Sequence, residues 1–107
     1  MAVRLNDDPV LAHFRNAVAR AYGAQIERLV LFGSRARGEA RAGSDYDVGV
    51  FLHDLRDFDR EARTLAEIET DILTATGAVI HALPLRAGLH QDRTGLMQDL
   101  RRDGRDL

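Results

Sequence analysis

The protein has 107 residues, of which 45% are hydrophobic and 30% charged, and this length predicts a single domain over residues 1–107 with a modest core. Cysteine is absent and all fifteen basic residues are arginine, which excludes disulfides, thiolate chemistry and lysine-based catalysis. The formal net charge of -2 argues against direct nucleic-acid binding, and the lack of a long apolar run or signal-like N-terminus predicts a cytoplasmic protein without membrane contact.

A first helix is predicted from Asp8, which suits the N-cap, and from Pro9, which suits the first helical position. The helix is expected to end near Gly23, because apolar residues recur before it with helical spacing, at Leu11, Phe14, Val18, Ala21 and Tyr22. Residues 26–32 are rich in β-forming residues and precede a glycine. We therefore expect a buried strand that turns at Gly33.

The next two segments contain the residues of greatest chemical interest. Residues 35–43 are rich in glycine, alanine and arginine, which indicates a turn of helix followed by a loop. Residues 45–52 predict a second strand. Because side chains alternate along a strand, Asp45 and Asp47 are expected on the same face of the sheet.

The second half of the chain predicts a helix, a strand and a short helix. The helix covers residues 57–76, with an inner side formed by Phe58, Ala62, Leu65, Ile68, Ile72 and Leu73. The strand covers residues 78–85, and the last helix covers residues 94–102, with Leu96, Met97 and Leu100 inward. Helices and strands thus alternate along the chain, which predicts an α/β (α+β) fold with a small mixed sheet flanked by helices.

Two carboxylates on one face of a strand lie about 7 Å apart and can hold a divalent cation. Gly33 and Ser34 add backbone N–H groups and a hydroxyl, which are suitable donors for phosphate. Taken alone, the Gly-Ser pair fits an ordinary turn, and Asp45 and Asp47 fit a solvated end of a strand. Their combination at this spacing favours a site for a metal-bound polyphosphate.

The stretch "LFGSRARGEARAGSDYDVGV", residues 31–50, resembles the signature of the nucleotidyltransferase superfamily that includes DNA polymerase β. That signature is a hydrophobic residue before Gly-Ser, a spacer, and then Asp-x-Asp between hydrophobic residues. The whole chain resembles the minimal nucleotidyltransferases, the MNT class, whose fold it is therefore expected to share. Members of that class typically act as antitoxins of HEPN-domain RNase toxins, which implies a HEPN partner and a hetero-oligomer.

The resemblance also implies roles for individual residues. Gly33 and Ser34 would hold the β and γ phosphates of a nucleoside triphosphate, with ATP as the expected substrate. Asp45 and Asp47 would bind Mg²⁺, or Mn²⁺ in its place. The metal would neutralise the phosphates and align the α-phosphate for attack by a hydroxyl, with pyrophosphate leaving.

Three further positions complete the comparison with the superfamily. Arg35 and Arg37 match its variable but basic positions after the serine, and the resemblance implies contact with phosphate or with the acceptor. A third carboxylate is usual on a later strand, but residues 77–85 contain no Asp or Glu, and His81 stands at that position. Three functional roles of this position stay open: His81 acts as the base with one metal bound, a softer ion such as Mn²⁺ is used, or nucleotide binding persists without transfer. A purely structural or solvent-facing role of His81 is an equal alternative to a functional one.

The leading hypothesis is an antitoxin that binds a HEPN toxin and transfers AMP from ATP to one of its hydroxyls, such as that of a tyrosine. The alternative is an antitoxin of the same fold that neutralises its partner by binding alone. Nucleotide transfer to a small molecule is a third hypothesis, although relatives of that type usually carry an added helical domain. The other histidines, His13, His53 and His90, are expected on the surface.

Overall fold

A computed structural model describes residues 7–107, and within them four strands form one mixed sheet. The strands are β1 (Ile26–Phe32), β2 (Tyr46–Leu52), β3 (Ile80–Arg86) and β4 (Arg105–Asp106). They lie in the order β3-β2-β1-β4, with β1 antiparallel to β2 and β4. The pair β2 and β3 is parallel, which requires a crossover connection between them. The predicted mixed sheet is confirmed.

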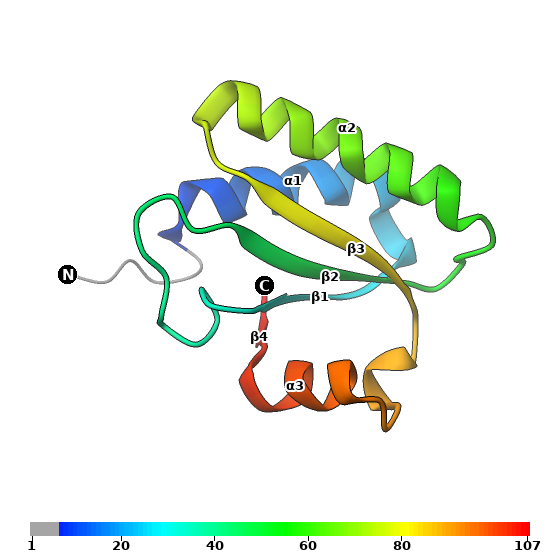
Figure 1. The fold of residues 1–107 in the computed structure, drawn as a ribbon. Coiled ribbons are helices and arrows are strands. Elements are labelled where there is room, and N and C mark those ends of the chain that lie inside the picture. Colours follow the sequence, from blue (N-terminus) through cyan, green and yellow to red (C-terminus); the bar gives the residue numbers. More distant parts are fainter. Residues whose placement is uncertain (1–6) are drawn as a thin grey trace.

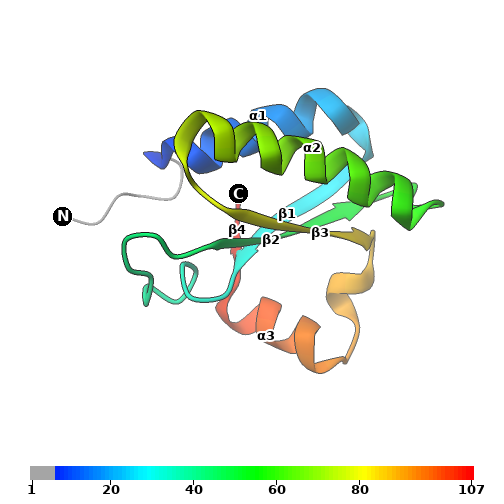
Figure 2. The same cartoon turned by 45° about the horizontal axis from the view of Figure 1, so that its top comes forward.

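Helices cover both faces of the sheet. Helices α1 (Pro9–Tyr22) and α2 (Phe58–Thr76) lie on one face, and α3 (Gly95–Asp103) lies on the other, below the sheet in Figure 1. Figure 2 shows the same layers after rotation. Two short 3-10 helices, η2 (Gly23–Gln25) and η3 (Leu89–Gln91), follow α1 and precede α3. Across residues 7–107, none of the helices combines the length and apolar character needed to cross a membrane.

The two long helices begin and end at the residues that the sequence indicates. The Asp8 side chain accepts hydrogen bonds from the N–H groups of Val10 and Leu11 in α1, and the Asp57 side chain accepts one from the N–H of Arg60 in α2. Gly23 ends α1, and Gly77 ends α2 with φ of 78°, a left-handed conformation that favours glycine. Capping therefore sets the bounds of both helices, and these bounds differ from the predictions by one residue at most.

The core is divided by the sheet into two clusters of different size. The larger cluster lies between the sheet and helices α1 and α2. The smaller one, between the sheet and α3, consists of Val30, Phe51, Leu85, Met97 and Leu100. A Cβ at Gly49 would lie 3.2 Å from Leu85 and 3.6 Å from Leu100. Side chains that contact α3 thus cover this face of the sheet as far as Gly49. The part of the face beyond Gly49 carries Asp47 and His81, which lie opposite each other on β2 and β3.

Several predictions of local structure are wrong. The side chains of Phe58, Leu73 and Leu96 were expected inward, but they are 51%, 48% and 43% exposed. Residues 35–43 form turns without a helix, and β4 was not predicted. Helical spacing identifies the apolar stripe of a helix but does not determine which residues at its margins are buried, because the width of the buried stripe depends on the neighbouring elements.

His90 was expected on the surface but is buried, with 9% exposure. Its ring lies edge-on to Phe51, with the centroids 5.5 Å apart, and its Nδ1 is 2.5 Å from Nη1 of Arg28. Burial, followed by the Arg28 charge, lowers the pKa of His90. The sequence could not predict this burial, because a single histidine in a short segment is not part of a periodic apolar pattern.

Candidate active site

Asp45 and Asp47 lie on the face of the sheet that carries α3, beyond the area covered by that helix. The alternate residues of β2, Val48 and Val50 among them, are fully buried on the opposite face. Asp47 pairs with Phe32 of β1 and with His81 of β3, so it lies in the middle of the sheet. Asp45 precedes β2 and keeps 48% of its side chain exposed. The two carboxylates are therefore open to a ligand from this face.

Gly33 is in direct contact with the Asp47 carboxylate. The antiparallel pairing of β1 with β2 places the residue after Phe32 beside Asp47. A Cβ on Gly33 would lie 2.5 Å from Oδ2 of Asp47, closer than atoms can approach, and Gly33 also has a φ of 75°. Only glycine suits both constraints. The fold thus brings the predicted Gly-Ser turn and one predicted metal ligand together.

His81 is also in this site, where it contacts Asp45. Its Nε2 lies 2.9 Å from Oδ2 of Asp45, and the ring is 59% exposed. This hydrogen bond raises the pKa of His81. Burial raises the pKa of Asp47, and the Asp45 charge adds to this, whereas His81 and Arg37 lower it. The electrostatics therefore favour a cation near Asp47.

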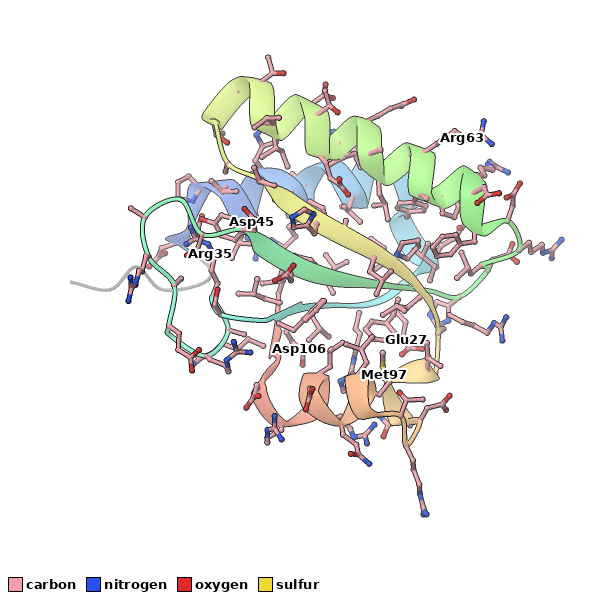
Figure 3. All side chains as sticks on the ribbon, viewed as in Figure 1. Glu27, Arg35, Asp45, Arg63, Met97 and Asp106 are labelled. Carbon is pink, nitrogen blue, oxygen red and sulfur yellow. The ribbon has the colours of Figure 1, made fainter. Side chains whose placement is uncertain are left out.

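The two arginines after Ser34 have different surroundings. The Arg35 guanidinium donates to the carbonyl oxygen of Ser44 from Nε at 3.0 Å and from Nη2 at 2.8 Å. Arg37 is exposed, with an ion pair to Glu39 at 3.1 Å, and its charge acts on Asp47. Arg37 is thus accessible to a phosphate, whereas Arg35 is engaged with its own loop (Figure 3).

The donor atoms suit one magnesium ion. Mg²⁺ prefers oxygen ligands and commonly uses one or two carboxylates, with water and substrate phosphates completing its shell. Asp45 and Asp47 supply two carboxylates, and the contact of Asp47 with Gly33 places one of them beside the Gly-Ser turn. Among residues 7–107, no three His, Asp or Glu side chains converge closely enough to hold a metal. His81 therefore does not complete a three-ligand site in this arrangement.

The sequence analysis missed the residues that surround Asp45. Tyr46 is buried, with 6% exposure, and its hydroxyl donates to Oδ2 of Asp8 at 2.9 Å. Burial, followed by the Asp8 hydrogen bond, raises the pKa of Tyr46. A tyrosine on the buried face of a strand is a signal for such a partner, because its hydroxyl has to be hydrogen-bonded there. The identity of the partner depends on the tertiary structure.

Comparison with known proteins identifies relatives over most of the chain. The family model described as polymerase beta, nucleotidyltransferase, matches residues 16–102. A curated relative from Methanocaldococcus jannaschii, named as a protein adenylyltransferase, is 33% identical over 79 residues. That alignment covers 74% of this chain and 73% of the relative.

Solved structures share the fold at lower identity. A chain in a toxin-antitoxin crystal structure with AMP-PNP matches with a TM-score of 0.62 and 20% identity, over 87% of this chain and 68% of that chain. A structure of tri-AMPylated HEPN toxin in complex with MNT antitoxin, from Shewanella oneidensis, matches with a TM-score of 0.54 and 17% identity. The match covers 91% of this chain and 70% of that chain. At these identities the similarity establishes the fold alone.

Proposed function

Because this chain belongs to the polymerase beta nucleotidyltransferase family, we propose that it transfers AMP from ATP to a tyrosine hydroxyl of a HEPN toxin and thereby acts as the antitoxin of that toxin. The relative named as a protein adenylyltransferase supports a protein acceptor. The neighbouring structures of toxin-antitoxin complexes, one with AMP-PNP and one with an AMPylated HEPN toxin, support the nucleotide and the partner. The functional unit would then be a hetero-oligomer.

The reaction forms one phosphorus–oxygen bond and breaks another. The acceptor oxygen attacks the α-phosphorus of ATP, the bond from that phosphorus to the bridging oxygen of the β-phosphate breaks, and pyrophosphate leaves. The acceptor hydroxyl gives up its proton. Gly33 and Ser34 would bind the β and γ phosphates, and Arg37 would add a positive charge beside them.

Asp45 and Asp47 would hold Mg²⁺, or Mn²⁺ in its place. When bound, such an ion neutralises phosphate charge and orients the triphosphate for in-line attack. His81 is the candidate base for the acceptor proton. Its ring is exposed on the same face as the carboxylates, and an imidazole can accept a proton near neutral pH.

The contact between Asp47 and the Gly33 backbone is the observation that carries this proposal. It puts a carboxylate against a turn whose N–H groups can bind phosphate, on an exposed part of the sheet. A solvated strand end would require neither the glycine nor the partly buried position of Asp47. The arrangement is suited to a triphosphate that bridges the turn and a metal ion.

The test is intact-mass analysis of this chain co-expressed with a HEPN toxin and incubated with Mg²⁺ and each nucleoside triphosphate in turn. We expect the toxin to gain one AMP mass per event with ATP, and we expect Asp45→Asn and Asp47→Asn to abolish that gain. Asp71→Asn is the matched control, because Asp71 is exposed on α2, on the other side of the sheet. Undiminished transfer by the Asp45 and Asp47 variants would refute the metal assignment.

One observation favours a second candidate function. The resemblance to the superfamily places His81 where a third carboxylate is usual, and its Nε2 lies 2.9 Å from Oδ2 of Asp45. An antitoxin that neutralises its partner by binding alone could keep this pair and dispense with transfer. In that case the complex would form without any mass change, and toxin neutralisation would persist when Asp45 and Asp47 are both replaced by Asn.

A further inference from the structure

We propose that Arg35 is a positioning residue that fixes Asp45 by holding the residues on either side of it, Ser44 and Tyr46. This proposal rests on the proposed function only in naming Asp45 as a metal ligand. The Arg35 guanidinium donates two hydrogen bonds to the Ser44 carbonyl, and its Cζ lies 3.8 Å from the centroid of the Tyr46 ring. Figure 3 shows Arg35 and Asp45 together where β2 begins.

Ser44 is held at each of its polar groups. Its carbonyl accepts from Arg35, its N–H donates to the carbonyl of Arg41 at 2.9 Å, and its Oγ accepts from the N–H of Arg41 at 2.8 Å. The bonds to Arg41 close a local turn. The bonds from Arg35 connect this turn to the beginning of the loop, nine positions earlier in the chain.

Tyr46 is held equally firmly on the other side of Asp45. Its N–H donates to the carbonyl of Val79 at 2.9 Å, and its hydroxyl donates to Asp8 at 2.9 Å. Asp8 is itself the N-cap of α1. The ring is therefore a fixed plane within the core, and the Arg35 guanidinium stacks on it.

Asp45 needs this support because it lies outside the sheet. The pairing of β2 with β3 begins at Tyr46, opposite Ile80, so the strand ladder does not extend to Asp45. The hydrogen bond to His81 restrains the carboxylate, but the His81 ring is exposed. The backbone position of Asp45 is therefore set by its two neighbours, and both of them contact Arg35.

The geometry also explains why arginine is required. A guanidinium is planar and has several fixed donors, so it can stack on a ring and donate two hydrogen bonds to one carbonyl at once. A lysine ammonium carries the same charge but can neither stack in this way nor present the fork. Arg35→Lys therefore keeps the positive charge but removes the stacking and the paired hydrogen bonds, so it distinguishes a positioning role of Arg35 from an effect of its charge.

The first test is titration of the full chain with Mn²⁺, followed by electron paramagnetic resonance. Loss of a group that orients a metal ligand typically costs 10- to 100-fold in affinity, and we expect a loss of this size in both Arg35→Ala and Arg35→Lys. Arg41→Ala is the matched control, since it removes one arginine side chain from the same loop and keeps the backbone N–H that binds Ser44. Its affinity should stay within about twofold of the wild type.

Chemical rescue provides a readout that general destabilisation would not give. The Arg35 guanidinium forms part of the wall of a surface pocket of about 240 Å³, together with Gly43, Ser44, Tyr46 and residues 76–79. Guanidinium ions added to Arg35→Ala can enter from this side, and we expect them to restore Mn²⁺ affinity at concentrations where ammonium does not. Equal rescue by ammonium would indicate a role of charge alone and would overturn the proposal.

Amide hydrogen exchange decides the proposal even if the wild type binds no metal. We expect exchange in residues 43–47 to accelerate about tenfold or more in Arg35→Ala and Arg35→Lys, as the loss of charge-assisted hydrogen bonds requires, and to be unchanged in Arg41→Ala. Exchange and Mn²⁺ affinity that match the wild type in both Arg35 variants would overturn the proposal. Faster exchange without metal binding by the wild type would instead support the positioning role and count against Asp45 as a metal ligand in the absence of nucleotide.

Discussion

Replacement of Gly33 by alanine tests the contact on which the candidate site depends. The new Cβ would lie 2.5 Å from Oδ2 of Asp47, whereas ordinary van der Waals contact begins at 3.4 Å. The carboxylate must therefore move by about 0.9 Å, which is the difference between these two distances. A shift of about 1 Å in a reacting group can cost about 100-fold in rate, so we expect transfer by Gly33→Ala to fall by about this factor.

Gly38→Ala is the matched control for this variant. Gly38 has a φ of 74°, close to the 75° of Gly33, but nothing lies within 4 Å of a Cβ added there. Both variants should lose about 1–2 kcal/mol of stability from the left-handed backbone. The carboxylate of Asp47 is the end of a rotatable side chain, so its displacement adds little to that loss.

The assay combines thermal denaturation with the rate of AMP transfer, both measured on the two variants and the wild type. We expect similar midpoints for Gly33→Ala and Gly38→Ala, with each kcal/mol lowering Tm by roughly 4–8 °C in a domain of this size. Transfer should be lost in Gly33→Ala alone. Equal transfer by the two variants would refute the idea that Gly33 holds the Asp47 carboxylate in place.

Two further predictions concern stability. Asp8→Ala removes the N-cap of α1 and the partner of the buried Tyr46 hydroxyl, so it should lower the free energy of unfolding by more than about 2 kcal/mol. Asp57→Ala removes only the N-cap of α2 and should lower it by about 1 kcal/mol. Equal losses for the two variants in urea denaturation would contradict this prediction. Burial, together with the nearby Glu61 carboxylate, raises the pKa of Tyr22 to about 12, from 10.0 for a free tyrosine. The folded state thus holds the Tyr22 proton more tightly than the unfolded state, so the free energy of unfolding should fall as pH rises from 10 to 12. A fall of the same size in Tyr22→Phe would show that ionisation of Tyr22 is not its cause.

The sequence could predict part of the candidate site, because Asp45 and Asp47 lie close together in the chain. Alternation along one strand places Asp45 and Asp47 on the same face, and a glycine after a strand indicates a turn. The proximity of Gly33 to Asp47 follows only from the pairing of β1 with β2, in which Phe32 lies opposite Asp47. The sequence contains no local signal for this register.

The errors in predicted burial have a common physical cause. Phe58 and Leu96 fit the apolar period of their helices, but 51% and 43% of their surface stays exposed in the folded protein. His90, in η3, is buried because Phe51 of β2 and Arg28 of β1 contact it. Each error concerns a contact between segments that are distant in the chain.

The amino-acid sequence by itself determined helices α1, α2 and α3, strands β1 to β3, the residues that cap α1 and α2, and the set of acidic and glycine residues that suit a metal-bound phosphate. These features depend on neighbours within a few positions, through side-chain period, capping and turn chemistry. The tertiary structure alone decided that α3 leaves the sheet open around Asp47, that His81 contacts Asp45, and that Arg35 contacts both Ser44 and Tyr46. Those contacts arise when the β2-β3 crossover and the loop after β1 fold back onto the sheet, and such long-range pairing has no local pattern in the chain.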